Sequence, residues 1–216
     1  MTLELHAHPF SSYCQKVLIA LYENATPFAY RTLEGEAAMA DLKALWPLGR
    51  FPLLVDDGHA VAEASIIVEH LCLHHPGPVE LVPRNPVAAL PVRAMDRVFD
   101  NYVMTPMQTI VADAMRPEAE RDATAVAAAR ATLGTAYAWL DTKLTGQEWA
   151  AGSFSLADCA AAPALFYADW VQPIDASFPN LAAYRRRLLA RPSMARAVDE
   201  ARPYRKYFPP GAPDRD

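Results

Sequence analysis

The period of the hydrophobic pattern changes near residue 77, and this change constrains the fold more than any other feature. Before that point, short runs with apolar residues at alternate positions, as in strands, are interspersed with runs at helical spacing. Beyond about residue 91, the patterned segments all have helical spacing. The sequence therefore predicts an α/β domain with the element order βαβαββα, followed by an all-α helical domain.

Prolines mark the boundary between the two patterns. The segment from residue 75 to 91 has five prolines, at positions 76, 78, 83, 86 and 91, and its composition is that of a linker. The expected divisions are a first domain at 1–77, a linker at 78–90, a helical domain at 91–206 and a Pro-rich, extended surface tail at 207–216. Pro106 should kink a helix that covers about 86–115, because proline removes a backbone donor.

Composition excludes several classes of partner. The chain has 216 residues with 20 basic and 25 acidic side chains, a net charge of −5. This balance argues against nucleic acid, because neutralising phosphates requires clustered Lys and Arg; we interpret the basic run at 184–187 as the solvated face of a helix. The N-terminal sequence does not resemble a signal peptide, and no apolar run is long enough to span a membrane. We expect a soluble cytoplasmic protein with no membrane partner.

Two hydroxyls and a thiol lie where a strand leads into a helix, in the stretch PFSSYCQKV. If the helix begins near Ser12, its first amides lack internal partners and favour an anion. A hydroxyl there can donate a hydrogen bond to a ligand thiolate, and lowering a thiol pKa by about two units requires about 2.7 kcal/mol. Alternatively, Ser11 or Ser12 only caps the helix. Cys14, on the apolar face, is interpreted as a buried, inert thiol rather than a nucleophile.

Two further stretches could contact a ligand. The bond between Phe51 and Pro52 could be cis, which would expose the Phe51 backbone to a peptide-like ligand, or it could be an ordinary trans bond at the start of a strand. Glu63, Ala64 and Ser65 precede the next helix. Its amides could bind a carboxylate and Glu63 an ammonium group, unless Ser65 is simply the N-cap.

Other signals indicate structure rather than chemistry. Ser155 and Asp158 have capping-box spacing, and we interpret Asp158 as a cap rather than a catalytic acid. His6 with His8, and His70 with His74, have spacings that can hold zinc, but no converging carboxylate or cysteine set is evident, so no metal is expected. The three cysteines, at 14, 72 and 159, have neither disulfide nor metal spacing, and their low, odd number fits a reducing compartment.

Four segments together resemble the cytosolic glutathione transferases: PFSSYCQKVLIALYE, WPLGRFPLLVDDG, EASIIVEHL and FSLADCAAAP. The resemblance covers nearly the whole chain. It implies a thioredoxin-like N-terminal domain, an all-helical C-terminal domain, and usually a homodimer. The spacing of Ser11 and Cys14 is similar to that of the serine-type classes, which suggests a bacterial theta/zeta-like member.

The resemblance also assigns site residues. It implies that Ser11 hydrogen-bonds the glutathione sulfur, with Ser12 as the alternative because the doubled serine blurs the alignment. The remaining implied contacts to glutathione, which is the co-substrate, are the Phe51 backbone beside a cis Pro52, the γ-glutamyl segment at Glu63, Ala64 and Ser65, and Arg50 near the glycine carboxylate. Two positions depart from the family pattern: Ala64 replaces a common serine and Trp46 a common asparagine.

The expected activity is detoxifying conjugation of glutathione to a small hydrophobic electrophile. Candidates for the electrophile pocket are Tyr13, Tyr102, Met104, Met107 and Tyr167. Two other hypotheses remain open. One retains glutathione but changes the reaction, to isomerisation or to disulfide reduction through Cys14. The other is a non-catalytic binding module on the same fold.

Overall fold

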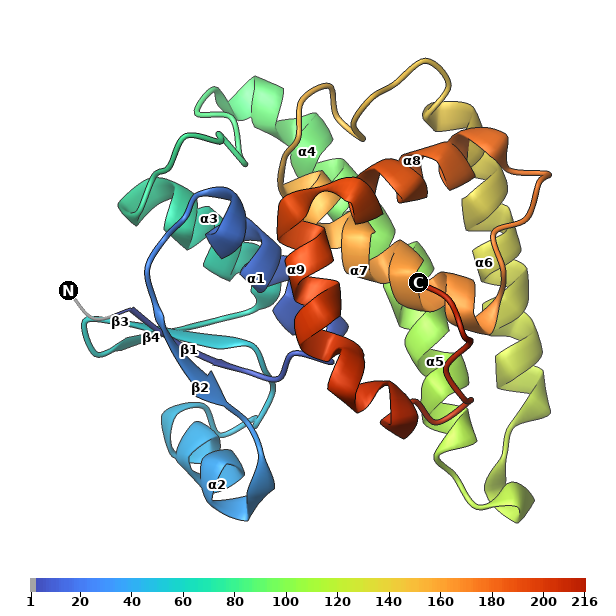
Figure 1. The fold of residues 1–216 in the computed structure, drawn as a ribbon, viewed down its shortest axis with the longest axis horizontal. Coiled ribbons are helices and arrows are strands. Elements are labelled where there is room, and N and C mark those ends of the chain that lie inside the picture. The colour runs from blue at the N-terminus through green and yellow to red at the C-terminus, as the bar shows by residue number, and fades with distance from the viewer. Residues whose placement is uncertain (1–2) are drawn as a thin grey trace.

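The computed structural model describes residues 3–216. The elements of the α/β domain are β1 (Leu3–Ala7), α1 (Ser12–Glu23), β2 (Ala29–Thr32), α2 (Gly35–Leu45), β3 (Leu53–Asp56), β4 (His59–Ala62) and α3 (Ala64–His74). The helical region contains α4 (Pro86–Val98), a π-helix η1 (Phe99–Met104), α5 (Thr105–Ala114), a short 3₁₀ turn η2 (Glu118–Glu120), α6 (Ala123–Lys143), α7 (Leu156–Val171), α8 (Pro179–Ala190), α9 (Pro192–Ala201) and a 3₁₀ helix η3 (Arg202–Tyr207). The order βαβαββα and the helical second half confirm the predicted fold class (Figure 1).

The four strands form one mixed sheet in the order β2-β1-β3-β4. β1 pairs in parallel with β2 and antiparallel with β3, and β3 forms a hairpin with β4. Leu3, Leu5 and Ala7 alternate with half-buried residues along β1, as a strand with one face on the core requires. Helices α1 and α3 cover one face of the sheet and α2 covers the other (Figure 1).

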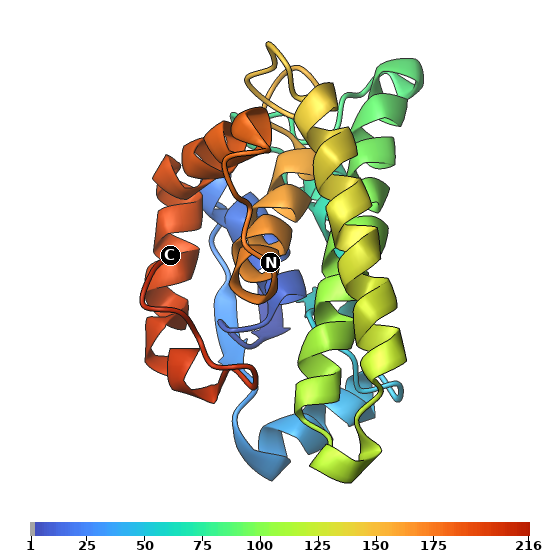
Figure 2. The ribbon, with the colours of Figure 1, turned by 90° about the vertical axis from the view of Figure 1, so that its right-hand side faces the viewer.

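The helical region is built around α7. Every residue of this Ala-rich helix is buried, and Figure 2 shows it enclosed by the other helices of the region. The predicted capping box is present at its start. The Asp158 carboxylate accepts the Ser155 N–H at 2.9 Å, and it also accepts the Tyr184 hydroxyl at 2.6 Å. Burial raises the pKa of Asp158, and its hydrogen bonds to the segments around it identify it as a structural residue.

The helix expected over 86–115 is interrupted differently from the prediction. It is divided into α4 and α5 by η1, and Pro106 lies in the first turn of α5, where its missing N–H is tolerated. The expected linker at 78–90 is also helical from Pro86 onward. The reason is local, because Asn85 caps the helix by accepting the N–H groups of Val87 and Ala88.

Two expectations about polar surface segments hold only in part. Phe208, in the expected surface tail, is buried, and its ring stacks against Tyr167 with centroids 6.1 Å apart. Arg185, in the basic run, is buried and lies 3.3 Å from Asp169, so only part of that run faces solvent. Among residues 3–216, none of the helices combines the length and the apolar character that a membrane span requires.

Candidate functional site

A cleft of about 1210 Å³ lies between the two domains. Its walls come from the N-termini of α1 and α3, the loop before β3, the α4–α5 segment, α7 and the C-terminal tail. The structure brings most of the sequence-predicted site residues to this cleft: Ser11, Ser12, Tyr13, Arg50, Phe51, Pro52, Glu63, Ala64, Ser65, Met107 and Tyr167. These residues come from both domains, so the cleft exists only when the domains are packed together.

Ser11 is the N-cap of α1 and faces the cleft. Its backbone is extended, and its Oγ accepts the N–H of Cys14 at 3.4 Å. This cap uses the oxygen as an acceptor, so the cap itself does not consume the hydroxyl proton, which can be donated to the Cys14 sulfur or to a group in the cleft. Ser12 begins the helix and is buried, although it also lines the cleft. Capping and ligand binding are therefore compatible roles for Ser11 rather than alternatives.

The turn that presents Ser11 is anchored by two buried side chains. Gln15 Nε2 donates to the Pro9 carbonyl at 2.9 Å and to the Tyr167 hydroxyl at 3.0 Å, and that hydroxyl donates to the Phe10 carbonyl at 3.1 Å. A helix of the second domain thus fixes the backbone just before the cap. Gln15 was not among the predicted site residues, although a glutamine on an otherwise apolar helix face is an unusual feature in the sequence.

Cys14 is the buried thiol that the sequence indicated. It is fully buried, and burial raises its pKa to about 12. Its sulfur accepts the His8 N–H at 3.4 Å. A thiol of this acidity is protonated at neutral pH, which removes the main requirement for a nucleophile.

The loop before β3 and the turn before α3 also belong to the α/β domain, and they line the cleft together with the turn at Ser11. The Phe51–Pro52 bond is cis, as the family resemblance implied and the sequence alone did not favour. Trp46 also lines the cleft and packs against the small core under the sheet. Glu63 has φ 71°, in the left-handed region that side chains other than glycine rarely adopt. Such strain is typical of ligand sites, and here it turns the start of α3 toward the cleft.

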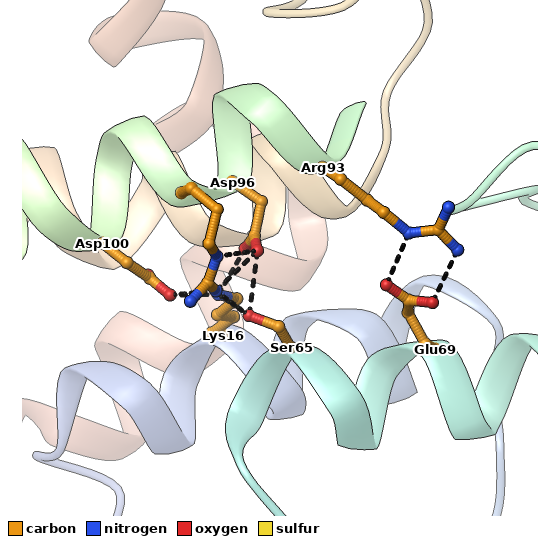
Figure 3. Close-up of polar contacts among 7 residues, drawn as sticks. Lys16, Ser65, Glu69, Arg93, Asp96 and Asp100 are labelled. Carbon is orange, nitrogen blue, oxygen red and sulfur yellow. Dashed lines mark hydrogen bonds and ion pairs between the residues drawn. The ribbon is translucent and has the colours of Figure 1, made fainter. Parts of the chain in front are cut away.

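Ser65 does not cap α3. The helix begins at Ala64 with Glu63 as its N-cap, and no side chain provides the cap bond. The Ser65 hydroxyl instead accepts Lys16 Nζ at 2.8 Å and donates to Asp96 at 2.9 Å (Figure 3). The amides at the start of the helix remain without intrahelical partners, so the expected role of this terminus in binding a carboxylate does not need the hydroxyl.

Lys16 is at the centre of a buried charge cluster on the floor of the cleft. Its side chain is fully buried, pairs with Asp96, and lies 2.9 Å from Asp100. Arg97 reaches both aspartates from the cleft side at 2.6 Å. Burial raises the pKa of Asp100, and the two cations act against that rise. The two aspartates and two cations balance in charge, and they connect α1 and α3 to α4 (Figure 3).

Part of the helical side of the cleft is apolar, away from the charged residues of α4. Phe10, Tyr167, Trp170 and Phe208 form an aromatic cluster whose neighbouring rings have centroids 5.0–6.4 Å apart. Across the cleft, α5 contributes Met107 and Val111, four residues apart on one face, and its C-cap Met115 continues that spacing. The site therefore joins a polar half, formed by the α/β domain and α4, to an apolar half that suits a hydrophobic molecule.

Two predicted pocket residues lie elsewhere. Met104 is fully buried in the core, and Tyr102 is 55% exposed outside the cleft. Both belong to the π-helix, whose extra residue per turn moves side chains off the face expected for an α-helix. Residues 207–209 of the tail also line the cleft, and the sequence analysis did not predict this. Nothing in the local sequence indicates that the tail folds back onto the cleft.

The expectation that no carboxylate converges with the histidines is wrong. Asp56 Oδ2 lies 2.8 Å from His70 Nε2 and 2.7 Å from His75 Nε2. His75, rather than the His74 suggested by helical spacing, joins His70. This cluster lies at the far end of α3 from the cleft, and its residues are not among those that line it.

A thioredoxin-like domain packed on an all-helical domain, with a cleft at the N-termini of α1 and α3, defines the class of protein. Comparison with known families then identifies it. The model of the glutathione S-transferase N-terminal domain matches residues 5–79, and that of the C-terminal domain matches residues 100–192. The chain belongs to the glutathione S-transferase family.

Solved structures agree with this assignment. A glutathione S-transferase from Methylobacterium radiotolerans, in complex with glutathione sulfonate, is 32% identical with a TM-score of 0.80 over 92% of this chain and 95% of that one. A glutathione transferase family member from Pseudomonas fluorescens, with bound glutathione, is 26% identical with a TM-score of 0.80 over 91% and 98%. No curated protein sequence matches the chain.

Proposed function

We propose that the protein is a serine-type transferase that conjugates glutathione to small hydrophobic electrophiles. The observation that carries the proposal is the position of Ser11, which caps α1 and lines the cleft at the N-terminus of that helix. The similar proteins that bind glutathione or its sulfonate support glutathione as the co-substrate. The finer assignment to a theta/zeta-like class rests on the spacing of Ser11 and Cys14 in the sequence.

Each part of glutathione has a complementary surface in the cleft. The cysteinyl unit pairs with the Phe51 backbone beside the cis Pro52, and the exposed Arg50 is near enough to the loop to attract the glycine carboxylate. The γ-glutamyl carboxylate binds the free amides at the start of α3, including that of Ala64, so the serine missing there is dispensable. Glu63 then attracts the ammonium group.

The reaction follows from the two halves of the site. Ser11 donates a hydrogen bond to the glutathione sulfur, and the positive end of α1 adds to this, so the thiol loses its proton to solvent more readily. The thiolate attacks an electrophilic carbon against the apolar wall of Tyr167, Phe208 and Met107. An S–C bond forms while the leaving group departs with the electron pair, or while the electron pair moves onto an activated double bond.

Conjugation of 1-chloro-2,4-dinitrobenzene tests the proposal with three matched variants. Ser11→Ala should lower kcat/KM by about tenfold or more, which corresponds to about 1.4 kcal/mol or more of thiolate stabilisation. Ser12→Ala and Cys14→Ser should retain activity within a few fold. If Ser12→Ala is the inactive variant, the serine assignment changes to Ser12; if Cys14→Ser is inactive and Ser11→Ala is active, the reductase hypothesis replaces conjugation.

A non-catalytic role is tested by calorimetry. The strained turn at Glu63 and the free amides of α3 favour a functional ligand site, so we expect glutathione to bind with a measurable heat. No heat at millimolar glutathione, with folded protein, would favour the binding-module hypothesis. Isomerase activity would appear as turnover of a glutathione adduct back to free thiol, without net consumption of glutathione.

The proposed assembly is a cytoplasmic homodimer. Exposed apolar side chains lie on α3 and α4, which the Glu69–Arg93 ion pair joins at 2.7 Å (Figure 3). These side chains are Ile66, Leu73, Val87 and Leu90, each more than half exposed in the single chain. A second copy would bury them. Light scattering should give twice the chain mass, and Leu73→Glu together with Leu90→Glu should shift it to the monomer.

A further inference from the structure

A second group of chemistry-bearing side chains lies at the other end of α3. Asp56 ends β3, immediately before the Asp57–Gly58 turn, while His70 lies in α3 and His75 is the C-cap of that helix. Both imidazole Nε2 atoms approach the same oxygen, Asp56 Oδ2, at 2.8 and 2.7 Å. We propose that Asp56, His70 and His75 form a binding site for a divalent transition metal, of which zinc is the best match.

The geometry fits a tetrahedral metal ion. The three donor atoms all lie within 4.8 Å of one another. Ligands at about 2.0–2.2 Å from zinc are separated by about 3.3–3.6 Å in a tetrahedron, so only small side-chain movements are needed. In the structure, a proton on each imidazole can bridge to Asp56 Oδ2. A metal ion would replace those protons and use the same lone pairs.

The donor set selects the kind of metal. Two imidazoles and one carboxylate suit zinc and its neighbours in the first transition series, whereas calcium and magnesium prefer oxygen ligands alone. The three side chains are half-buried, with 14–20% of each exposed. A fourth position therefore remains open to water or to one more side chain.

Two further histidines, His59 and His74, lie next to the three proposed ligands, and either could become the fourth ligand. His59 is the partner of Asp56 in the β3–β4 register, so its side chain is on the same face of the hairpin. The His74 ring packs on the His70 ring with centroids 4.4 Å apart. Four of the six histidines in the chain thus gather at this end of α3.

The position of the site also favours a cation. His75 is the C-cap of α3, and the carbonyl groups at the end of a helix carry partial negative charge. His70 and His75 lie five and ten residues along the chain from Ser65, or about 7.5 and 15 Å along the helix axis, and neither of them lines the cleft. Metal binding would therefore join the β3–β4 hairpin to α3 without contacting the proposed glutathione site, and the inference does not depend on the proposed function.

Calorimetric titration of the EDTA-treated full chain with ZnCl₂ tests the site. One equivalent of zinc should bind per chain, and the melting temperature should rise with zinc. His70→Gln and His75→Gln keep an amide donor for Asp56 but remove the zinc ligand, so each should weaken binding by at least about tenfold. His6→Gln, on β1 outside the cluster, is the matched control and should bind as the wild type does.

A cobalt titration gives a readout that ordinary hydrogen bonds would not produce. CoCl₂ should develop the strong visible absorption of a tetrahedral complex in the wild type, and zinc should displace it. The proposal is overturned if the folded wild type binds no zinc, or if the His70→Gln/His75→Gln double variant binds it with unchanged affinity. Unchanged folding of the variants is checked by circular dichroism.

Discussion

Lys16 Nζ lies 2.9 Å from Asp100 Oδ2, and this contact between two buried side chains joins the first helix of the α/β domain to the helical domain. Lys16 also pairs with Asp96 and contacts Ser65. The charges that connect the domains therefore lie beneath the cleft that both domains form. Loss of Lys16 would leave the buried carboxylates of Asp96 and Asp100 facing one another with Arg97 as their remaining cation.

Replacing Lys16 by Met should destabilise the protein by about 3–5 kcal/mol, because removing one partner leaves buried charge uncompensated. Urea unfolding at pH 7 measures the change. Arg31→Gln is the control, since it breaks a solvent-exposed pair with Glu4 and should change the stability much less. Equal effects of the two substitutions would show that the buried cluster contributes nothing beyond a surface pair.

The pH dependence of conjugation should report the glutathione thiolate. Because the thiolate reacts, kcat/KM for the electrophile, measured at saturating glutathione, rises with pH until the bound thiol is ionised. A free thiol has a pKa of about 8.5, and the wild type should show an apparent value about two units lower. In Ser11→Ala the profile should shift toward the free-thiol value, so the two enzymes differ most near pH 6 and least above pH 9. Superimposable profiles would argue against a role for Ser11 in thiolate formation.

Cys14 should resist alkylation in the folded protein. With its pKa raised to about 12 by burial, only about one part in 10⁴ is thiolate at pH 8, and the sulfur is inaccessible. Iodoacetamide followed by peptide mass analysis should find Cys72, which is half-buried, modified before Cys14 and Cys159. Denatured protein should be modified at all three, and rapid native labelling of Cys14 would contradict the assignment of an inert thiol.

Phe208→Ala should weaken binding of the electrophile. The ring closes the apolar wall through contacts with Tyr167 and Trp170, so its loss should raise the KM for the electrophile several-fold while leaving the KM for glutathione unchanged. Tyr102→Ala is the control, because Tyr102 lies outside the cleft and should alter neither constant. If Tyr102→Ala raised the KM for the electrophile and Phe208→Ala left it unchanged, the electrophile would bind on another surface.

The fold was predictable because its information is local. The alternation of Leu3 and Leu5 and the helical spacing after Ser12 identify β1 and α1 without reference to any distant residue. The polar half of the cleft was predictable for the same reason, since strand-to-helix turns at Ser11 and Glu63 place helix amides at one edge of the sheet. The cis bond before Pro52 could be predicted only from the family resemblance, because the local sequence alone favours a trans bond.

Features that depend on distant partners were not predictable. Lys16 and Asp100 are 84 residues apart, and neither residue indicates the other. His75 joins Asp56 because the helix ends there and leaves its regular spacing, so periodicity selected His74 instead. Phe208 contacts Phe10 and Tyr167 only after the tail folds back, and a Pro-rich composition is equally typical of a solvated segment.

The π-helix at 99–104 means that the register of α5 depends on chain length as well as on side chains. Each residue of a regular helix turns the chain by about 100°. Deleting one residue from this turn would restore α-helical winding and rotate Met107, Val111 and Met115 out of the cleft together. A one-residue deletion would thus replace, in a single step, all the side chains that α5 presents to the electrophile pocket. Point substitutions would have to change these side chains one at a time to alter the substrate preference as much.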